Sequence, residues 1–147
     1  MILSFALAAL LAGTPRAQAD DPNAHPPVSP DDIKILLRAE QILDSPAHWN
    51  RNDNRKCPTD ATTFSLYCAV ERATNEISGQ CAHREAAMQE VRFVIDDIAA
   101  NRHYEHRLMN YNNDRTTTLA DIQHVLKVAE TNIAKKLAKQ NKSAPPA

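Results

Sequence analysis

Glycine is scarce in this sequence, since Gly13 and Gly79 are the two glycines among 147 residues. A β-rich fold built from hairpins needs many more, because tight turns place residues at positive φ, where glycine fits best. Aromatic residues make up 5% of the chain, so a core has to be built from Ala, Leu, Ile and Val. Scarce glycine combined with abundant Ala, Leu, Lys and Glu favours helices. We therefore predict an all-α fold.

An excess of either charge is also missing. The chain has 17 basic and 18 acidic residues, which are intermixed and leave a net charge of −1. A nucleic-acid-binding protein usually carries a basic excess or a basic stripe. We therefore predict no nucleic-acid partner.

Apolar runs are short, and the longest one lies at the N-terminus. Residues 2–12 are apolar apart from Ser4, and Ala17-Gln18-Ala19 follows after a Gly/Pro segment. This pattern is typical of a secretory signal peptide, whereas a bilayer-spanning helix needs about 20 apolar residues. We predict a signal peptide at 1–19, cleaved before Asp20, and an exported protein, periplasmic or secreted, with no membrane span after cleavage. A buried N-terminal helix is the alternative.

The remaining chain divides into a leader, one domain of ordinary size and a tail. Residues 20–28 contain three prolines and little to bury, so we expect a flexible leader. We place the helical domain at 29–140 and a disordered tail at 141–147.

Apolar spacing within the domain predicts about four amphipathic helices. Each has to bury one face, so a single compact core is the simplest arrangement. An extra short helical turn is expected at Leu108 and Met109. The four longer helices are expected at 29–45, from Thr59 or Asp60 to about Ser78, at roughly 83–100, and from Thr118 onward.

Capping residues define several helix ends. Ser29 at the N-cap is followed by Pro30 and by a carboxylate, Asp32, at the third helical position. Thr118 and Asp121 form a variant of the capping box. Gly79 suits the left-handed position that ends many helices.

Three cysteines, Cys57, Cys68 and Cys81, leave at least one thiol unpaired. If the second helix begins at Thr59, Cys68 lies about 13 Å along it, too far from Cys57 for a disulfide. Pairing therefore requires that helix to begin late, end early or break. We expect Cys68 to be a buried free thiol, and Cys57 or Cys81 to be available for a disulfide-linked dimer.

Catalytic and metal-binding motifs are incomplete. His103 and His106 lie three residues apart, but the metalloprotease pattern is missing. Asn110, Asn112, Asp114 and Asp121 have the spacing of a calcium loop, but Arg115 stands where such a loop needs glycine. The alternation of Asn50, Asn52 and Asn54 indicates a turn-rich loop. We predict no catalytic residue, no cofactor and no metal site.

Two segments resemble a known family. Trp49, a polar linker and Cys68-Ala69-Val70-Glu71-Arg72-Ala73 are similar to the first half of a family of small bacterial helical domains of unknown function. The segment 112–116, Asn-Asn-Asp-Arg-Thr, before the helix at 119–129, resembles its second half. The chain departs from the family where Val70 and Glu71 replace a nearby glycine, and where Tyr111 or Asn112 replaces a common Trp. The resemblance, roughly over 33–133, implies a compact helical fold and no catalytic residues.

Polar loops on a rigid helical frame favour a function in binding. We expect an exported binding module for a protein or small-molecule partner. Two alternatives remain open: a small envelope hydrolase using His103 or His106, and a structural or oligomer-forming envelope protein. Trp49 either fastens its loop to the core or anchors an interface. The predicted binding surface consists of Trp49, Tyr111, Asn112, Asn113, Asp114 and Arg115.

Overall fold

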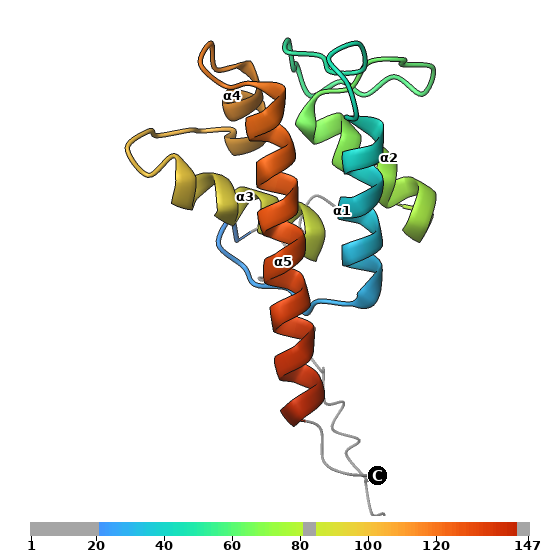
Figure 1. The fold of residues 1–147 in the computed structure, drawn as a ribbon, viewed down its shortest axis with the longest axis vertical. Coiled ribbons are helices and arrows are strands. Elements are labelled where there is room, and N and C mark those ends of the chain that lie inside the picture. Colours follow the sequence, from blue (N-terminus) through green and yellow to red (C-terminus); the bar gives the residue numbers. More distant parts are fainter. Residues whose placement is uncertain (1–20, 81–84, 144–147) are drawn as a thin grey trace, which may run out of the picture.

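The computed structural model describes residues 21–80 and 85–143, and this part of the chain contains five helices (Figure 1). Between them, strand-like pairing is limited to an isolated bridge between Trp49 and Phe64. The all-α prediction is confirmed, and the short turn expected at Leu108 and Met109 is a helix of its own. The helices are α1 Pro30–Ile42, α2 Leu66–Ser78, α3 Ala86–Ile98, α4 Arg107–Asn113 and α5 Leu119–Ser143.

The longest helix, α5, provides the surface on which the others assemble. Both α1 and α3 pack against α5, and α2 packs against α1. In Figure 1, α1 runs alongside α5, whereas α3 crosses behind it. The connection from α1 to α2 and the short α4 lie together at one end of the molecule. The fully buried apolar side chains of α5 are Ile122, Val125, Leu126, Ala129 and Ile133.

Capping interactions explain where two of these helices begin. The Asp32 carboxylate accepts hydrogen bonds from Ser29 N (2.7 Å) and, through its other oxygen, from Ala87 N (2.9 Å). One buried side chain therefore serves the N-terminal ends of both α1 and α3. The predicted capping box of α5 is present, with Thr118 N donating to Asp121 (2.8 Å) and Asp121 N donating to Thr118 Oγ (3.2 Å).

The segments that flank the helical domain differ from expectation where they are described. Residues 21–28 lie against the helices: Pro22 O accepts a hydrogen bond from Gln89 (2.6 Å), and the His25 ring stacks on Phe93 with centroids 4.4 Å apart. These contacts hold a stretch that composition alone marks as flexible. At the other end α5 continues to Ser143, into the predicted tail. The predicted signal peptide lies outside the described residues.

Helix α2 begins at Leu66, later than the predicted start at Thr59 or Asp60. Phe64, just before the helix, pairs instead with the start of the connection between α1 and α2, since Phe64 N donates to His48 O (2.7 Å) and Asn50 N donates to Phe64 O (2.9 Å). Ser65 then caps the helix by accepting from Cys68 N (3.2 Å). The predicted end of this helix is confirmed, because Gly79 follows α2 in the left-handed conformation, with φ of 77°.

This late start corrects the expected state of two cysteines. Cys57 and Cys68 form a disulfide within the chain, with Cα atoms 5.3 Å apart. Cys68 lies in the first turn of α2, so the helix no longer separates it from Cys57. Cys68 is therefore not a free thiol, and Cys57 is not available to link two chains. Cys81 lies outside the described residues, and a dimer through it stays a prediction.

Among the helices described here, none is long and apolar enough to span a bilayer.

The disulfide closes a loop across 11 positions, and its removal is expected to destabilise the fold. We expect the Cys57→Ser/Cys68→Ser double variant to lose about 3 kcal/mol of unfolding free energy, because an uncrosslinked unfolded chain has more conformational entropy. Denaturant unfolding under non-reducing conditions measures the loss, and Cys81→Ser is the control that keeps the bond. Equal stability of the two variants, or a mass of the native chain showing three free thiols, would contradict this pairing.

Candidate functional site

The connection between α1 and α2 contains a closed polar loop, residues 48–65, which we call the cleft loop. Its two ends are joined by the bridge between Trp49 and Phe64. Cys57, within the loop, is joined by the disulfide to Cys68 of α2. The loop is therefore held at its neck and near its middle, although it contains no helix or strand of its own.

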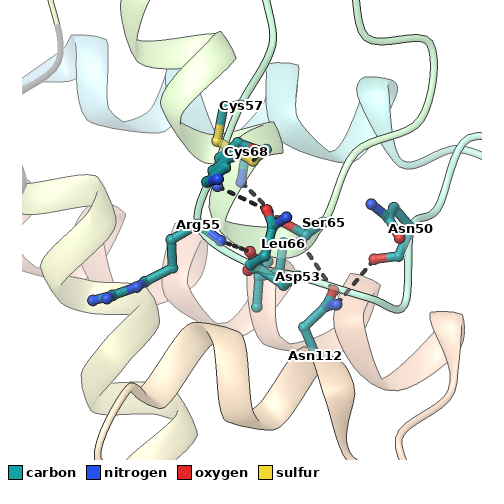
Figure 2. The surroundings of a disulfide bond; sticks show 10 residues. Asn50, Asp53, Arg55, Cys57, Ser65, Leu66, Cys68 and Asn112 are labelled. Carbon is teal, nitrogen blue, oxygen red and sulfur yellow. Dashed lines mark hydrogen bonds between the residues drawn. A yellow bond between two sulfur atoms is a disulfide. The ribbon is translucent and has the colours of Figure 1, made fainter.

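A buried amide, that of Asn112 at the end of α4, connects the cleft loop to two helices (Figure 2). Its Oδ1 accepts hydrogen bonds from Trp49 Nε1 (2.9 Å) and Leu66 N (3.0 Å). Its Nδ2 donates to Asn50 O (3.0 Å) and Asn113 Oδ1 (3.1 Å). The site needs both an acceptor and a two-proton donor, so it specifies an amide side chain.

The neighbouring Asn113 holds the backbone of Asp53. Asp53 N donates to Asn113 Oδ1, and Asn113 Nδ2 donates to Asp53 O, both at 2.8 Å. This pair of hydrogen bonds replaces the pairing that a neighbouring strand would give to an extended residue. Asp53 is thereby fixed in the middle of the loop.

Two arginines brace the outside of the cleft loop. The Arg51 guanidinium lies 5.0 Å from the centre of the Trp49 ring and donates to Asp114 O (2.7 Å). The Arg72 guanidinium lies 5.5 Å from the Phe64 ring and donates to Thr59 O (2.6 Å). Each cation–π contact at a solvent-facing position contributes about 0.5–1 kcal/mol.

Asp114, which follows α4, is the centre of a polar cluster beside the loop. Hydrogen bonds from the Thr116 backbone N–H (2.9 Å) and hydroxyl (2.7 Å), followed by the contact with Arg102, hold the pKa of Asp114 well below its usual range. The Tyr104 hydroxyl also donates to Asp114 (3.0 Å). The carboxylate is therefore charged and locally satisfied at neutral pH.

Tyr111 lies beneath this cluster. Its ring meets Tyr104 edge to face, with centroids 6.3 Å apart. Burial, with a smaller contribution from the charge of Asp121, raises the pKa of Tyr111 to about 12. Tyr111 is therefore a neutral packing residue under ordinary conditions.

A cleft of about 300 Å³ opens between the cleft loop and the first turn of α2. The disulfide forms part of its wall, and amide and hydroxyl side chains form much of the remainder. Its lining residues are Asn50, Asn52, Asp53, Asn54, Lys56, Cys57, Pro58, Ala61, Thr63, Ser65 and Cys68.

Asp53 is the acidic residue of this lining, and 6% of its surface is exposed. Its Oδ1 accepts a hydrogen bond from Arg55 N (2.7 Å), as Figure 2 shows. Its Oδ2 is buried and has no hydrogen-bond partner among the described residues. Leaving such an acceptor unpaired costs about 1–3 kcal/mol, and more when it is charged.

A larger cavity, of about 390 Å³, lies where residues 26–29 meet the starts of α1 and α3. Two polar residues of its wall, Ser29 and Asp32, are already hydrogen-bonded to each other, and Asp32 also accepts from α3. We therefore build the candidate site on the cleft.

The six residues of the predicted binding surface differ in their hydrogen bonds and in their burial. Trp49, Asn112 and Asn113 are joined in one hydrogen-bond network, and Asp114 accepts from Arg51 at its edge. Asn112 and Tyr111 are buried, so they can position a surface but offer little contact area themselves. Arg115 is exposed and takes no part in the network. The prediction that a partner binds to this surface stays untested.

Sequence reasoning missed Asp53, Thr63 and Ser65 as members of a site. The alternation of asparagines at 50, 52 and 54 indicated a turn-rich loop, and it brackets Asp53. No local pattern, however, indicates which side chains of such a loop face α2.

The residues considered for catalysis or metal binding do not converge. His103 is exposed, and Nδ1 of His106 lies 3.4 Å from an Arg55 guanidinium nitrogen. Asn110 accepts a hydrogen bond from His106 N (2.7 Å), whereas Asp121 caps α5. In residues 21–80 and 85–143, no group of three or more His, Cys, Asp or Glu side chains is placed to hold a metal ion.

Comparisons with known proteins identify a family whose function is unknown. The model of a family of unknown function matches residues 27–132. Neither a curated protein nor a solved structure matches the chain.

Replacing the buried amide tests its structural role. Asn112→Asp keeps an acceptor for Trp49 and Leu66 but removes both donated hydrogen bonds and places an oxygen against Asn50 O. We expect a loss of about 3 kcal/mol in unfolding free energy, measured by chemical denaturation. Asn101→Asp, on an exposed turn, is the matched control and should change stability little; an equal effect of both variants would show that Asn112 is dispensable.

The backbone of Arg55 allows a second test, because it adopts a left-handed conformation with φ of 60°. Arg55→Gly and Arg55→Ala both remove the guanidinium, but only alanine retains the Cβ that disfavours this conformation. We expect the alanine variant to be less stable than the glycine variant by about 1 kcal/mol, as measured by thermal unfolding. The opposite order would mean that the turn changes shape.

Proposed function

We propose that this chain, which belongs to DUF6197, a family of unknown function, is a binding module. Its partner is a small molecule or a side chain of another protein. The observation that carries the proposal is the polar cleft beside the disulfide, about 300 Å³ in volume. This volume lies at the lower end of the range found for ligand pockets, about 300–1,000 Å³.

The cleft loop supports the proposal because it is organised before any partner arrives. The disulfide, the bridge between Trp49 and Phe64, and the hydrogen bonds of Asn112 and Asn113 each restrain a different part of it. A restrained loop loses little conformational entropy on binding, so more of the contact energy contributes to affinity.

We further propose that the protein is exported to the periplasm or secreted. The apolar run and the Ala17-Gln18-Ala19 site support export, and the disulfide between Cys57 and Cys68 is a bond that persists in oxidising compartments. No specific observation favours the hydrolase or the oligomer alternative over binding.

A fragment screen tests whether the cleft binds ligands. We expect polar fragments to shift backbone amide resonances of Asn54, Lys56 and Ser65 in the oxidised protein, because these residues line the cleft. Ala61→Trp should abolish the shifts, because an indole at this lining position fills the cleft. Ala134→Trp, on the exposed face of α5, is the matched control and should leave them unchanged.

Two other outcomes of the fragment screen would contradict the proposal. Fragments that bind equally well to both tryptophan variants would place the site elsewhere. A screen that shifts none of the cleft resonances would overturn the proposed function.

A further inference from the structure

We propose that the group recognised in the cleft is a cationic hydrogen-bond donor, an ammonium or a guanidinium, and that Asp53 is the residue that binds it. This inference rests on the proposed function, because it names the chemical class of ligand for the same cleft. It follows from the position of one carboxylate and from the charges around it.

The first observation is that Asp53 cannot move away from the cleft. Asn113 holds both its backbone N–H and its carbonyl, and Arg55 N holds Oδ1. The second oxygen, Oδ2, is left buried without a partner in the described part of the protein. A fixed acceptor with unused capacity is complementary to a donor supplied by a ligand.

The second observation is that the basic side chains next to Asp53 in the loop do not pair with it. Figure 2 shows the Arg55 side chain extending away from Asp53. Its guanidinium lies beside the His106 ring instead, 3.4 Å from Nδ1. Lys56, which also lines the cleft, is exposed and has no ion pair with Asp53. The Asp53 carboxylate thus has no ion-pair partner within the described residues.

The rest of the lining suits a compact polar cation. Asn50, Asn52 and Asn54 contribute amide groups, and Thr63 and Ser65 contribute hydroxyl groups. Ammonium and guanidinium groups carry several donors and no acceptor, so amide and hydroxyl oxygens are their natural neighbours. The cleft contains no aromatic side chain in its lining, which disfavours a purely stacking ligand.

Access to the carboxylate requires a small rearrangement. Oδ2 is covered in the free protein, but the lining includes exposed side chains, those of Asn52 and Lys56 among them. A shift of such side chains opens a path to Oδ2, while Oδ1 keeps the bond to Arg55 N. A charge-assisted hydrogen bond to the ligand then satisfies the acceptor.

Titration of the oxidised, full-length protein with methylguanidinium chloride tests the proposal. We expect saturable shifts of the amide resonances of Asn54 and Ser65, and at least tenfold weaker binding for the neutral analogue methylurea. Asp53→Asn should weaken methylguanidinium binding at least tenfold, because it removes the charge and keeps the acceptor for Arg55 N. Asp60→Asn, an exposed acid of the same loop outside the lining, is the matched control and should bind as the unaltered protein does.

Folding of the variants is checked by thermal unfolding before titration. If Asp53→Asn does not fold, Ala61→Trp provides the second variant, because it fills the cleft without altering Asp53 and should also abolish binding. A titration with N-acetyl-arginine amide distinguishes the source of the cation. Binding at least tenfold tighter than that of methylguanidinium indicates a partner protein's side chain, whereas equal affinity indicates a small free cation.

Several results would overturn the inference, and they differ from failure of the proposed function. Equal affinity for methylurea, unchanged binding by Asp53→Asn, or shifts at the cleft caused by calcium but not by methylguanidinium would each exclude it. If neutral or anionic fragments occupy the cleft and cations do not, the cleft is a ligand site of another class. If nothing shifts the cleft resonances, both this inference and the proposed function fail.

Discussion

The structure around the cleft depends on one buried amide. Asn112 joins the end of α4 to Trp49, Asn50 and Leu66, which lie 63, 62 and 46 positions away in the chain. Polar networks in a low-dielectric interior are favourable only when every member is satisfied. The indole N–H, two backbone groups and the amide therefore have to meet together, and this requirement fixes the cleft loop against the helices.

The position of α2 and the chemistry of the cleft follow from that connection. With Leu66 N bound to Asn112, the helix starts after Ser65, and the residues before it pair with His48 and Asn50. The late start brings Cys68 within reach of Cys57. The same loop path places Asp53 beside Asn113 and leaves one of its carboxylate oxygens without a hydrogen-bond partner among the described residues.

The segments that carry the family resemblance are members of this network. Trp49, Cys68 and the stretch 112–114 are far apart in sequence but meet around the cleft loop. Their short motifs therefore contribute to closing the cleft loop, and they do not by themselves identify a ligand. The cleft residues that carry the proposals, Asp53 above all, lie between the motifs.

Local patterns in the sequence determined the helices, because apolar spacing and capping depend on residues within one or two turns. Asp32, Gly79 and the pair Thr118 and Asp121 act at helix ends as their positions predict. Tertiary structure decided the start of α2, the cysteine pairing and the unpaired oxygen of Asp53. The start of α2 depends on Asn112, 46 positions beyond Leu66, and the cysteine pairing follows from that start. The place of Asp53 depends on Asn113, 60 positions away, and no local propensity contains that information.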